Sequence, residues 1–199
     1  MRKMMKKVLL LFMQSKLYSW LLMKVVPFIR FTMYYTSFPG YKFYTAYLLL
    51  RPGDILVSKD KKKLTTMLVG GEWTHAALCV SKDKMFEIAE MTHKNFTRST
   101  FFDFCKENDE IAIYRLINDS PDYIDGMIIQ CLSMSDTEYD NQFKLGVEAL
   151  YCSELVYLSD FERRIGASLD DIAGLGREYI SPTGLTKGDG VKLIYDSRL

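Results

Sequence analysis

Short stretches of alternating or continuous apolar residues run through the middle and end of the chain, and turn-forming residues separate them. This pattern is typical of short strands in a sheet. The predicted strands cover residues 55–57, 74–80, 85–89, 110–116 and 191–195. The polar turn at residues 81–84 joins the second and third strands, so these two should form a hairpin.

Helical spacing and helix-ending residues mark a second set of elements. Residues 36–53, which contain Pro39 and Gly40, are interpreted as a linker-like stretch and turn, and residues 138–150 as irregular. Helices are predicted at residues 61–69, 99–106, 121–134 and 151–164, with a short helical turn starting at Ser181-Pro182. Short connections and segregated helices predict an α+β domain with an antiparallel sheet over residues 36–199.

The composition excludes several classes of protein. With 48% hydrophobic and 26% charged residues among 199, the chain has the profile of a globular protein and not of a disordered one. Four Cys without a C-x-x-C pair and only two His argue against a disulfide scaffold and a zinc site. No Gly-rich phosphate loop is present, and the net charge is only +1. We therefore expect no cofactor, no metal ion and no nucleic-acid partner.

The charges are unevenly distributed along the chain. Residues 1–53 contain nine Lys or Arg and no Asp or Glu, whereas the remainder has 17 basic and 25 acidic residues. Residues 1–35 are basic and apolar, but Lys16, Lys24, Pro27 and Arg30 interrupt the apolar run, which is too broken for a membrane span. A cleavable secretory signal is also a poor fit, because no small-residue cleavage site follows the short apolar run.

Residues 1–35 are therefore predicted to form one or two amphipathic helices, bent near Pro27. Apolar residues recur at helical spacing beside basic ones, which suits contact with an anionic membrane surface. The expected location is peripheral on a membrane, on a side that the sequence does not specify, with the cytoplasm as second choice. In the alternative interpretation this segment packs on the domain with its basic face in water.

Two chemically versatile residues lie on the predicted hairpin. His75 begins an apolar strand, where a histidine can be a core residue. A carboxylate on the neighbouring strand could hold one imidazole nitrogen and leave the other free as a base. Glu87, twelve residues later, and Glu90 are both candidates. A two-residue turn at Lys82-Asp83 would place Glu90 directly across from His75, so both assignments stay open, as does the alternative that both carboxylates are merely solvated.

Cys152 is the candidate nucleophile, because it stands where an irregular segment turns into a predicted helix. A helix N-terminus lowers the pKa of a thiol, and its unpaired N–H groups can bind an oxyanion. Cys79 and Cys131 have the surroundings of small apolar core residues, and no base is near Cys105 in the sequence. Cys152 could itself be a buried structural residue.

Five motifs in this order resemble the permuted papain-like cysteine hydrolases of the YiiX/YaeF kind, in the NlpC-type superfamily. They span roughly Leu48 to Asp196. The motifs are Arg51-Pro-Gly-Asp-Ile-Leu56, Thr74-His-Ala-Ala77, Phe86-Glu87, Tyr151-Cys-Ser-Glu-Leu-Val156 and Ser181-Pro-Thr-Gly-Leu185. The resemblance implies a circularly permuted papain-like fold, to which residues 1–35 are an addition.

The resemblance also implies a mechanism, with Cys152 as nucleophile, His75 as base and a third polar residue on the next strand, for which the spacing favours Glu87. The expected activity is hydrolysis of an amide bond in a peptide or cell-wall peptide through a covalent acyl-enzyme. One alternative is a lipid acyl hydrolase or acyltransferase resembling lecithin retinol acyltransferase, whose relatives carry His at the third position. Another is an inactive membrane-associated binding or structural module.

Overall fold

The structure is a computed structural model, and its described residues lie in the second of two units, residues 36–199. They are residues 38–61, 71–83, 85–140, 143, 145–146, 148–171 and 178–199. The predicted amphipathic helices of residues 1–35 lie outside the described residues, as does all but the first residue of the helix predicted at 61–69. Within the ranges described, no helix is both long and apolar enough to cross a bilayer.

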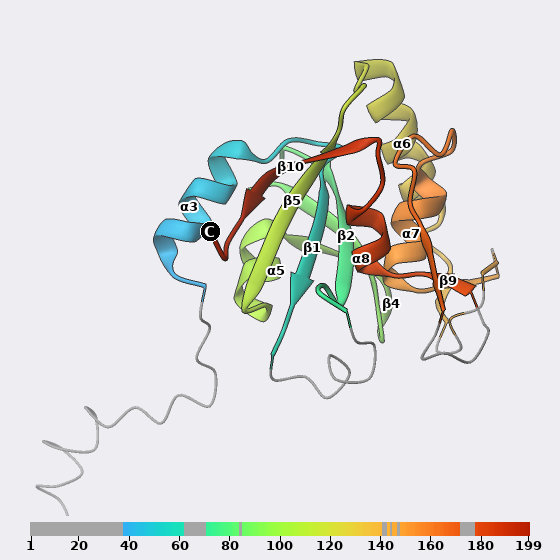
Figure 1. The fold of residues 1–199 in the computed structure, drawn as a ribbon, viewed down its shortest axis with the longest axis horizontal. Coiled ribbons are helices and arrows are strands. Elements are labelled where there is room, and N and C mark those ends of the chain that lie inside the picture. The colour runs from blue at the N-terminus through green and yellow to red at the C-terminus, as the bar shows by residue number, and fades with distance from the viewer. Residues whose placement is uncertain are drawn as a thin grey trace, which may run out of the picture. The chain divides into compact units, whose positions relative to one another are not determined.

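A sheet of six antiparallel strands forms the centre of the domain (Figure 1), in the order β10-β5-β1-β2-β3-β4. The strands are β1 (Ile55–Lys59), β2 (His75–Ser81), β3 (Glu87–Thr92), β4 (Asn95–Thr100), β5 (Glu110–Leu116) and β10 (Val191–Asp196). The predicted antiparallel sheet is confirmed. The sequence analysis missed β4, whose polar residues suit an edge strand more than a buried one.

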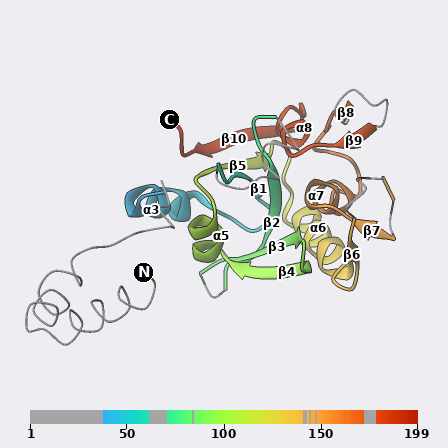
Figure 2. The ribbon, with the colours of Figure 1, turned by 90° about the horizontal axis from the view of Figure 1, so that it is seen from below.

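Side chains alternate between the two faces along every strand, and both faces of this sheet carry buried apolar residues. Helices therefore cover both faces. On one face, Leu56, Ala77 and Ile88 belong to the core beneath α3 (Gly40–Leu49) and α5 (Phe101–Glu107). Figure 2 shows these helices on one side of the strands and α6 (Pro121–Ser133) and α7 (Cys152–Ser159) on the other. The predicted α+β architecture is thus confirmed as a sheet between two layers of helices.

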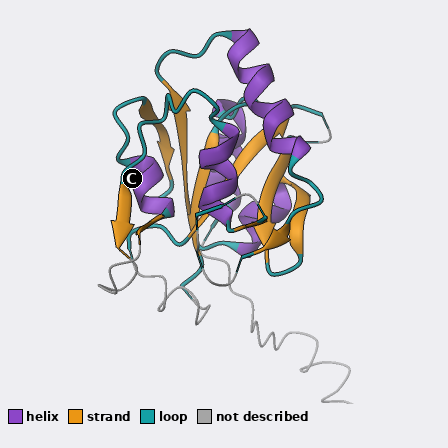
Figure 3. Ribbon diagram, turned by 90° about the vertical axis from the view of Figure 1, so that its right-hand side faces the viewer, coloured by secondary structure: helices purple, strands orange, loops and turns teal. Residues whose placement is uncertain are grey.

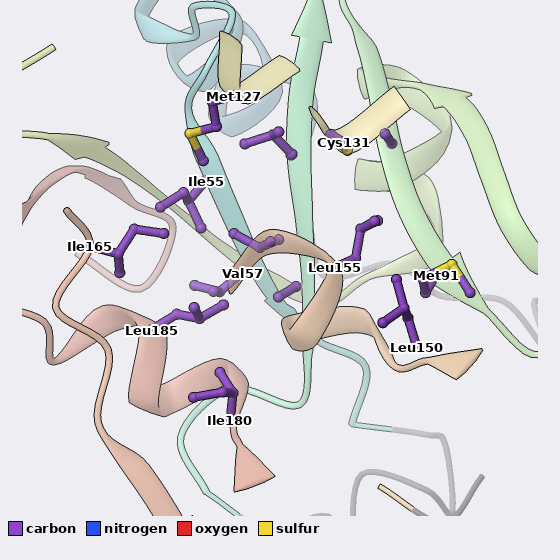
Figure 4. Close-up of a cluster of buried hydrophobic side chains, with 14 of the residues drawn as sticks. Ile55, Val57, Met91, Met127, Cys131, Leu150, Leu155, Ile165, Ile180 and Leu185 are labelled. Atoms are coloured by element: carbon purple, nitrogen blue, oxygen red, sulfur yellow. The ribbon is translucent and has the colours of Figure 1, made fainter. Parts of the chain in front are cut away.

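The second face holds the larger core. Here Ile55, Val57 and Met91 of the sheet pack with Met127 of α6 and Leu155 of α7 (Figure 4). The short helix α8 (Pro182–Thr186) completes this layer, which faces the viewer in Figure 3. This packing fixes α7 against the sheet, with contacts to both β2 and β3.

Helix α3 replaces the linker expected before residue 50, so that expectation is wrong. Pro39 occupies the N-cap position, and the helix runs from Gly40 to Leu49. Ala46 and Leu50 are buried, and Phe43 stacks on Phe101 of α5 at 5.6 Å between ring centroids. The Pro-Gly pair indicated a break, but a proline or glycine at the start of a helix is compatible with the helix that follows.

The three helices predicted near residues 99, 120 and 181 are confirmed, and each has a side-chain N-cap. The hydroxyls of Thr100, Ser120 and Ser181 each accept a hydrogen bond from the backbone N–H of the third residue of the helix that follows, α5, α6 and α8 respectively. Such caps satisfy donors that the first helical turn leaves unpaired.

Helix α7 is shorter than the helix predicted at residues 151–164, because it ends at Ser159. The buried carboxylate of Asp160 accepts hydrogen bonds from the backbone N–H groups of Arg164 and Ile165, and from the hydroxyl of Tyr123. A carboxylate that binds nearby N–H groups offers the backbone an alternative to the helix. The segment after Ser159 therefore turns back instead of continuing.

Two small strand pairs were not predicted, and the first of them lies in residues 138–150, which the sequence indicated to be irregular. β6 (Glu138–Tyr139) pairs in parallel with β7 (Ala149–Leu150), and β8 (Leu169–Asp171) pairs with β9 (Glu178–Ile180). Pairs this short contribute little stability by themselves. They hold the chain on either side of α7.

A buried ion pair fixes the turn that leads into β1. Arg115 of β5 donates to both carboxylate oxygens of Asp54, at 2.6 and 2.8 Å, and also to the carbonyl of Leu49 at the end of α3. The side chains are only 11% and 1% exposed. Burial raises the pKa of Asp54, although Arg115 acts in the opposite direction. The carboxylate therefore depends on its partner.

We expect Arg115→Met to lower the free energy of unfolding by about 3–5 kcal/mol at pH 7, because it leaves the Asp54 carboxylate buried and unpaired. A carboxyl group whose pKa is raised by folding destabilises the folded state only while it is ionised. The deficit should therefore shrink as the pH falls through the raised pKa of folded Asp54, and it should be largely gone at about pH 4 and below, where both states become protonated. Urea unfolding at both pH values measures this.

The exposed pair Glu162–Arg164 supplies the control. Glu162→Gln should cost less than about 1 kcal/mol, as is usual for surface ion pairs. An Arg115→Met variant as stable as this control would show that Asp54 does not need its partner.

Candidate active site

His75 is the first residue of β2 and is partly buried. Its Nε2 lies 2.6 Å from Oε2 of Glu90 on β3. The other carboxylate oxygen of Glu90 accepts a hydrogen bond of 2.9 Å from the hydroxyl of Ser99 on β4. Both oxygens of Glu90 are therefore engaged, and Glu90 holds the imidazole through Nε2.

The expected contact between Glu87 and His75 is wrong, because Glu87 forms an ion pair with Arg98 instead. Glu87 and Glu90 are three residues apart on one strand, so their side chains point to opposite faces. Ile88, which shares a face with Glu90, belongs to the core under α5, whereas Ala89 faces α7. The ring of His75 lies 6.1 Å from that of Phe104 of α5, on this same face, so Glu90 is the one of the two carboxylates that shares a face with His75.

The register of the hairpin explains this choice. Leu78 pairs with Ala89, and the ladder is irregular between Cys79 and Ser81. Met85 and Phe86 both have positive φ, so the extended backbone of β3 starts only at Glu87 and runs on to Thr92. The predicted strand stopped at Ala89 and so left out the carboxylate that matters.

Cys152 is the first residue of α7, at the predicted helix N-terminus. Its thiol is a hydrogen-bond partner of the His75 side chain, and the backbone N–H of Ala76 also donates to it. Because Nε2 of His75 is engaged by Glu90, we assign this contact to the other ring nitrogen, Nδ1. The structure thus brings Cys152, His75 and Glu90 into one connected series across α7, β2 and β3.

The electrostatics favour an ion pair between Cys152 and His75. Burial opposes both charges, but the contact with Cys152 and the carboxylate of Glu90 outweigh it and raise the pKa of His75 to about 10. Burial also acts against the thiolate, yet the hydrogen bond and charge of His75 lower the pKa of Cys152 below its usual value. A thiolate beside an imidazolium is the form in which a catalytic cysteine is nucleophilic.

Glu154, two residues after Cys152, is fully buried. Its Oε1 accepts a 2.8 Å hydrogen bond from the backbone N–H of Gly146, in the segment that precedes the nucleophile. Burial raises the pKa of Glu154 to about 7, although the N–H groups of Gly146 and Tyr151 lower it. The side chain thus ties this segment to the first turn of α7.

Tyrosines surround the thiol. The pKa values of Tyr139, Tyr151 and Tyr179 are raised by burial and by the negative charge of Cys152. The hydroxyl of Tyr151 accepts a hydrogen bond from the backbone N–H of Ile180, and the hydroxyl of Ser153 donates to the carbonyl of Ile180. These bonds join the start of α7 to β9 and give the nucleophile a fixed position.

The other cysteines have a different environment. Burial raises the pKa of Cys79, Cys105 and Cys131, and the structure gives all of them as free thiols. In the part of the chain that the structure describes, no three His, Cys, Asp or Glu side chains are grouped so that they could hold a metal ion.

Comparison with known protein families places the chain independently of the site geometry. A family model described as permuted papain-like amidase enzyme, YaeF/YiiX, C92 family, matches residues 49–189. The chain belongs to this C92 family. The match includes His75, Glu90 and Cys152, and it makes the protein a papain-like cysteine hydrolase of amide bonds.

A solved structure supports the fold of this C92 protein. The crystal structure of metalloprotein yiiX from Escherichia coli O157:H7 superposes with a TM-score of 0.66 at 11% sequence identity, covering 75% of this chain and 98% of that one. At this identity the likeness concerns the fold alone. A search of curated proteins finds no match.

Sequence reasoning missed three residues that support the C92 site. Ser99 lies on the edge strand that was not predicted, so nothing in the sequence indicated its contact with Glu90. For Glu154 the sequence did hold an indication, because a Glu three residues after a helix N-cap is typical of a capping box. Tyr139 lies in a segment interpreted as irregular, and nothing in its local pattern indicates closeness to Cys152.

We expect iodoacetamide to alkylate Cys152 readily at pH 6, because its lowered pKa leaves thiolate present there. In His75→Gln the pKa of Cys152 should rise to its ordinary value or above, because burial then acts without the imidazolium, and the rate at pH 6 should fall about tenfold or more. The measurement is the alkylation rate against pH, with the modified residue identified by mass spectrometry.

His93, in the exposed turn between β3 and β4, provides the matched control, and His93→Gln should leave the profile unchanged. Equal rates in the His75 and His93 variants would mean that the imidazole of His75 does not activate the thiol.

Proposed function

We propose that this C92 protein hydrolyses an amide bond of a peptide or cell-wall peptide, with Cys152 as nucleophile, His75 as acid and base, and Glu90 as the residue that positions His75. One observation carries the proposal: the imidazole lies between the thiol at the start of α7 and the carboxylate 2.6 Å from its Nε2. No step requires a cofactor.

In the first half of the reaction the Cys152 thiolate attacks the amide carbonyl carbon and forms a C–S bond. The carbonyl oxygen takes up the electron pair and is stabilised by the backbone N–H of Cys152 at the positive end of α7. When the C–N bond breaks, the leaving amine takes the proton from the His75 imidazolium. The products are a thioester on Cys152, a free amine and neutral His75.

In the second half a water molecule occupies the place of the departed amine. Neutral His75 takes a proton from this water, and the oxygen attacks the thioester carbon. The C–S bond breaks, a carboxylic acid is released, and the thiolate–imidazolium pair is restored. The same nitrogen of His75 thus gives one proton and receives one in each cycle.

Glu90 acts through His75 in both halves. Its carboxylate fixes the ring so that the remaining nitrogen faces Cys152, and its negative charge favours the imidazolium. The hydrogen bond from Ser99 to Oε1 of Glu90 fixes the carboxylate in turn. Glu90 therefore affects how readily the proton moves, while substrate binding depends on other groups.

The test of the function is hydrolysis of fluorogenic peptide and cell-wall peptide amides by the full chain, with mass spectrometry to detect the acyl group on Cys152. Cys152→Ala should lower kcat by a factor of about 1000 or more, since it removes the nucleophile. Hydrolysis of long-chain acyl esters without any amide turnover would favour a lipid acyl hydrolase instead. No thioester and no turnover on any of these substrates would favour an inactive module.

Glu90→Gln should lower kcat about 10- to 100-fold with little change in KM, because it removes a charge from the base and leaves the substrate contacts in place. The alkaline limb of the pH–rate profile should also move to lower pH, because the pKa of His75 falls without the charge of Glu90 and the imidazolium then loses its proton earlier.

Glu87→Gln is the matched control, because Glu87 lies on the same strand but pairs with Arg98. It should change kcat less than about twofold. The reverse ranking of the two variants would return the positioning role to Glu87.

A further inference from the structure

The outward face of α3 is apolar and uncovered. Tyr41, Tyr44 and Leu48 are 69%, 62% and 63% exposed. Their spacing of three and four residues places them on one side of the helix. We call these three residues the α3 outer face.

This face has no role in holding α3 to the domain. The opposite side of the helix does that, through buried Ala46 and through Phe43 and Tyr47, whose rings contact Phe101 and Phe86. Nor does α3 carry a charge outward: its one charged residue, Lys42, donates its ammonium group to the carbonyl of Ser197. The helix is thus apolar on both sides, and the fold uses one.

Single exposed apolar residues are common on protein surfaces, whereas groups of them mark contact sites. Some other exposed apolar residues lie on separate parts of the domain, as Met85, Ile117 and Ile129 do. The α3 outer face is different because three large side chains occur within eight residues. Two further exposed apolar residues are near this face. Leu49, 40% exposed, follows Leu48 in the sequence, and Phe102 of α5, 51% exposed, contacts Phe43 of α3 with its ring.

The sequence that leads into α3 indicates what this face contacts. Residues 1–35 contain seven Lys or Arg and no Asp or Glu, together with many apolar residues. Such a segment is attracted to anionic lipid headgroups. Only residues 36–39 separate it from Gly40, and five extended peptide units span at most about 18 Å. A membrane that holds residue 35 therefore lies within reach of α3.

The chemistry of the α3 outer face suits the same surface. Tyrosine is enriched at the boundary between lipid tails and headgroups, where its ring is in an apolar layer and its hydroxyl meets water. Two tyrosines and a leucine on an uncharged helix face match this boundary better than they match bulk water.

We propose that the α3 outer face docks the hydrolase domain on an anionic membrane surface, with Tyr41, Tyr44 and Leu48 inserted at the headgroup level. This goes beyond the amidase activity and does not depend on it. Docking through α3 makes the domain itself a membrane-binding surface, beyond any binding by residues 1–35.

The first experiment measures partitioning of the full chain onto vesicles of phosphatidylcholine with 30% phosphatidylglycerol, on the order of the anionic content that basic segments recognise. Replacing Tyr41, Tyr44 and Leu48 together by Ser should reduce the partition coefficient about tenfold or more, because apolar burial at the interface is lost. The fold reduction should be similar at low and high salt, since salt screens charges and not apolar contact.

The matched control replaces three exposed apolar residues of other elements, Met85, Ile117 and Ile129, by Ser. It should bind like the unmodified chain, and both variants should keep the original unfolding midpoint because all six side chains are exposed. If the α3 variant binds as well as the control variant, the proposal is wrong.

The second experiment identifies what covers α3. A nitroxide is attached to Leu48→Cys in the Cys152→Ala background, where burial keeps the remaining thiols unreactive. Vesicles should protect the label from an aqueous nickel reagent and expose it to oxygen dissolved in lipid. If the label is already protected from nickel without vesicles, another part of the chain covers α3. If that protection grows with protein concentration, a second copy of the chain covers it. Either result, or a label still open to nickel on vesicles, overturns membrane docking.

Discussion

The hydrogen-bonded series from Cys152 through His75 to Glu90 is the constraint on which the organisation of this site depends. Each member comes from a different element, so α7, β2 and β3 have to meet at one place. A charged pair in a buried setting is stable only if its partners are held at hydrogen-bond distance. The packing of α7 on the sheet is therefore also the means by which the thiolate form is favoured.

Polar contacts on both sides of the series hold its members in place. Ser99 fixes Glu90 from the edge strand, while Tyr151 and Ser153 tie the start of α7 to Ile180. Side chains oriented in this way do not have to reorganise during the reaction, which is how preorganised sites stabilise charge as it develops. The α6–α7–α8 layer thus acts as the rigid support, and the hairpin carries the proton-transfer groups.

The sequence was sufficient to predict the antiparallel sheet from its periodic apolar runs, and it singled out His75 and Cys152 as candidates because one begins an apolar strand and the other a helix. It did not distinguish Glu90 from Glu87, since that choice depends on a ladder irregularity and on two residues with positive φ that the apolar pattern does not encode. Helix α3 was missed for a related reason. It is apolar on both sides, so no helical periodicity separates one face from the other.

The irregularity between Cys79 and Ser81 has a consequence for how this hairpin can change during evolution. Side chains alternate with a period of two, so a slip of β3 by one residue against β2 would turn Glu90 away from His75 and bring an apolar neighbour into its place. A slip of two residues would restore the face but move Glu90 about 7 Å along the strand, out of hydrogen-bond reach of the imidazole. The turn between β2 and β3 can therefore change in length only where it absorbs the change without shifting the pairing of Leu78 with Ala89.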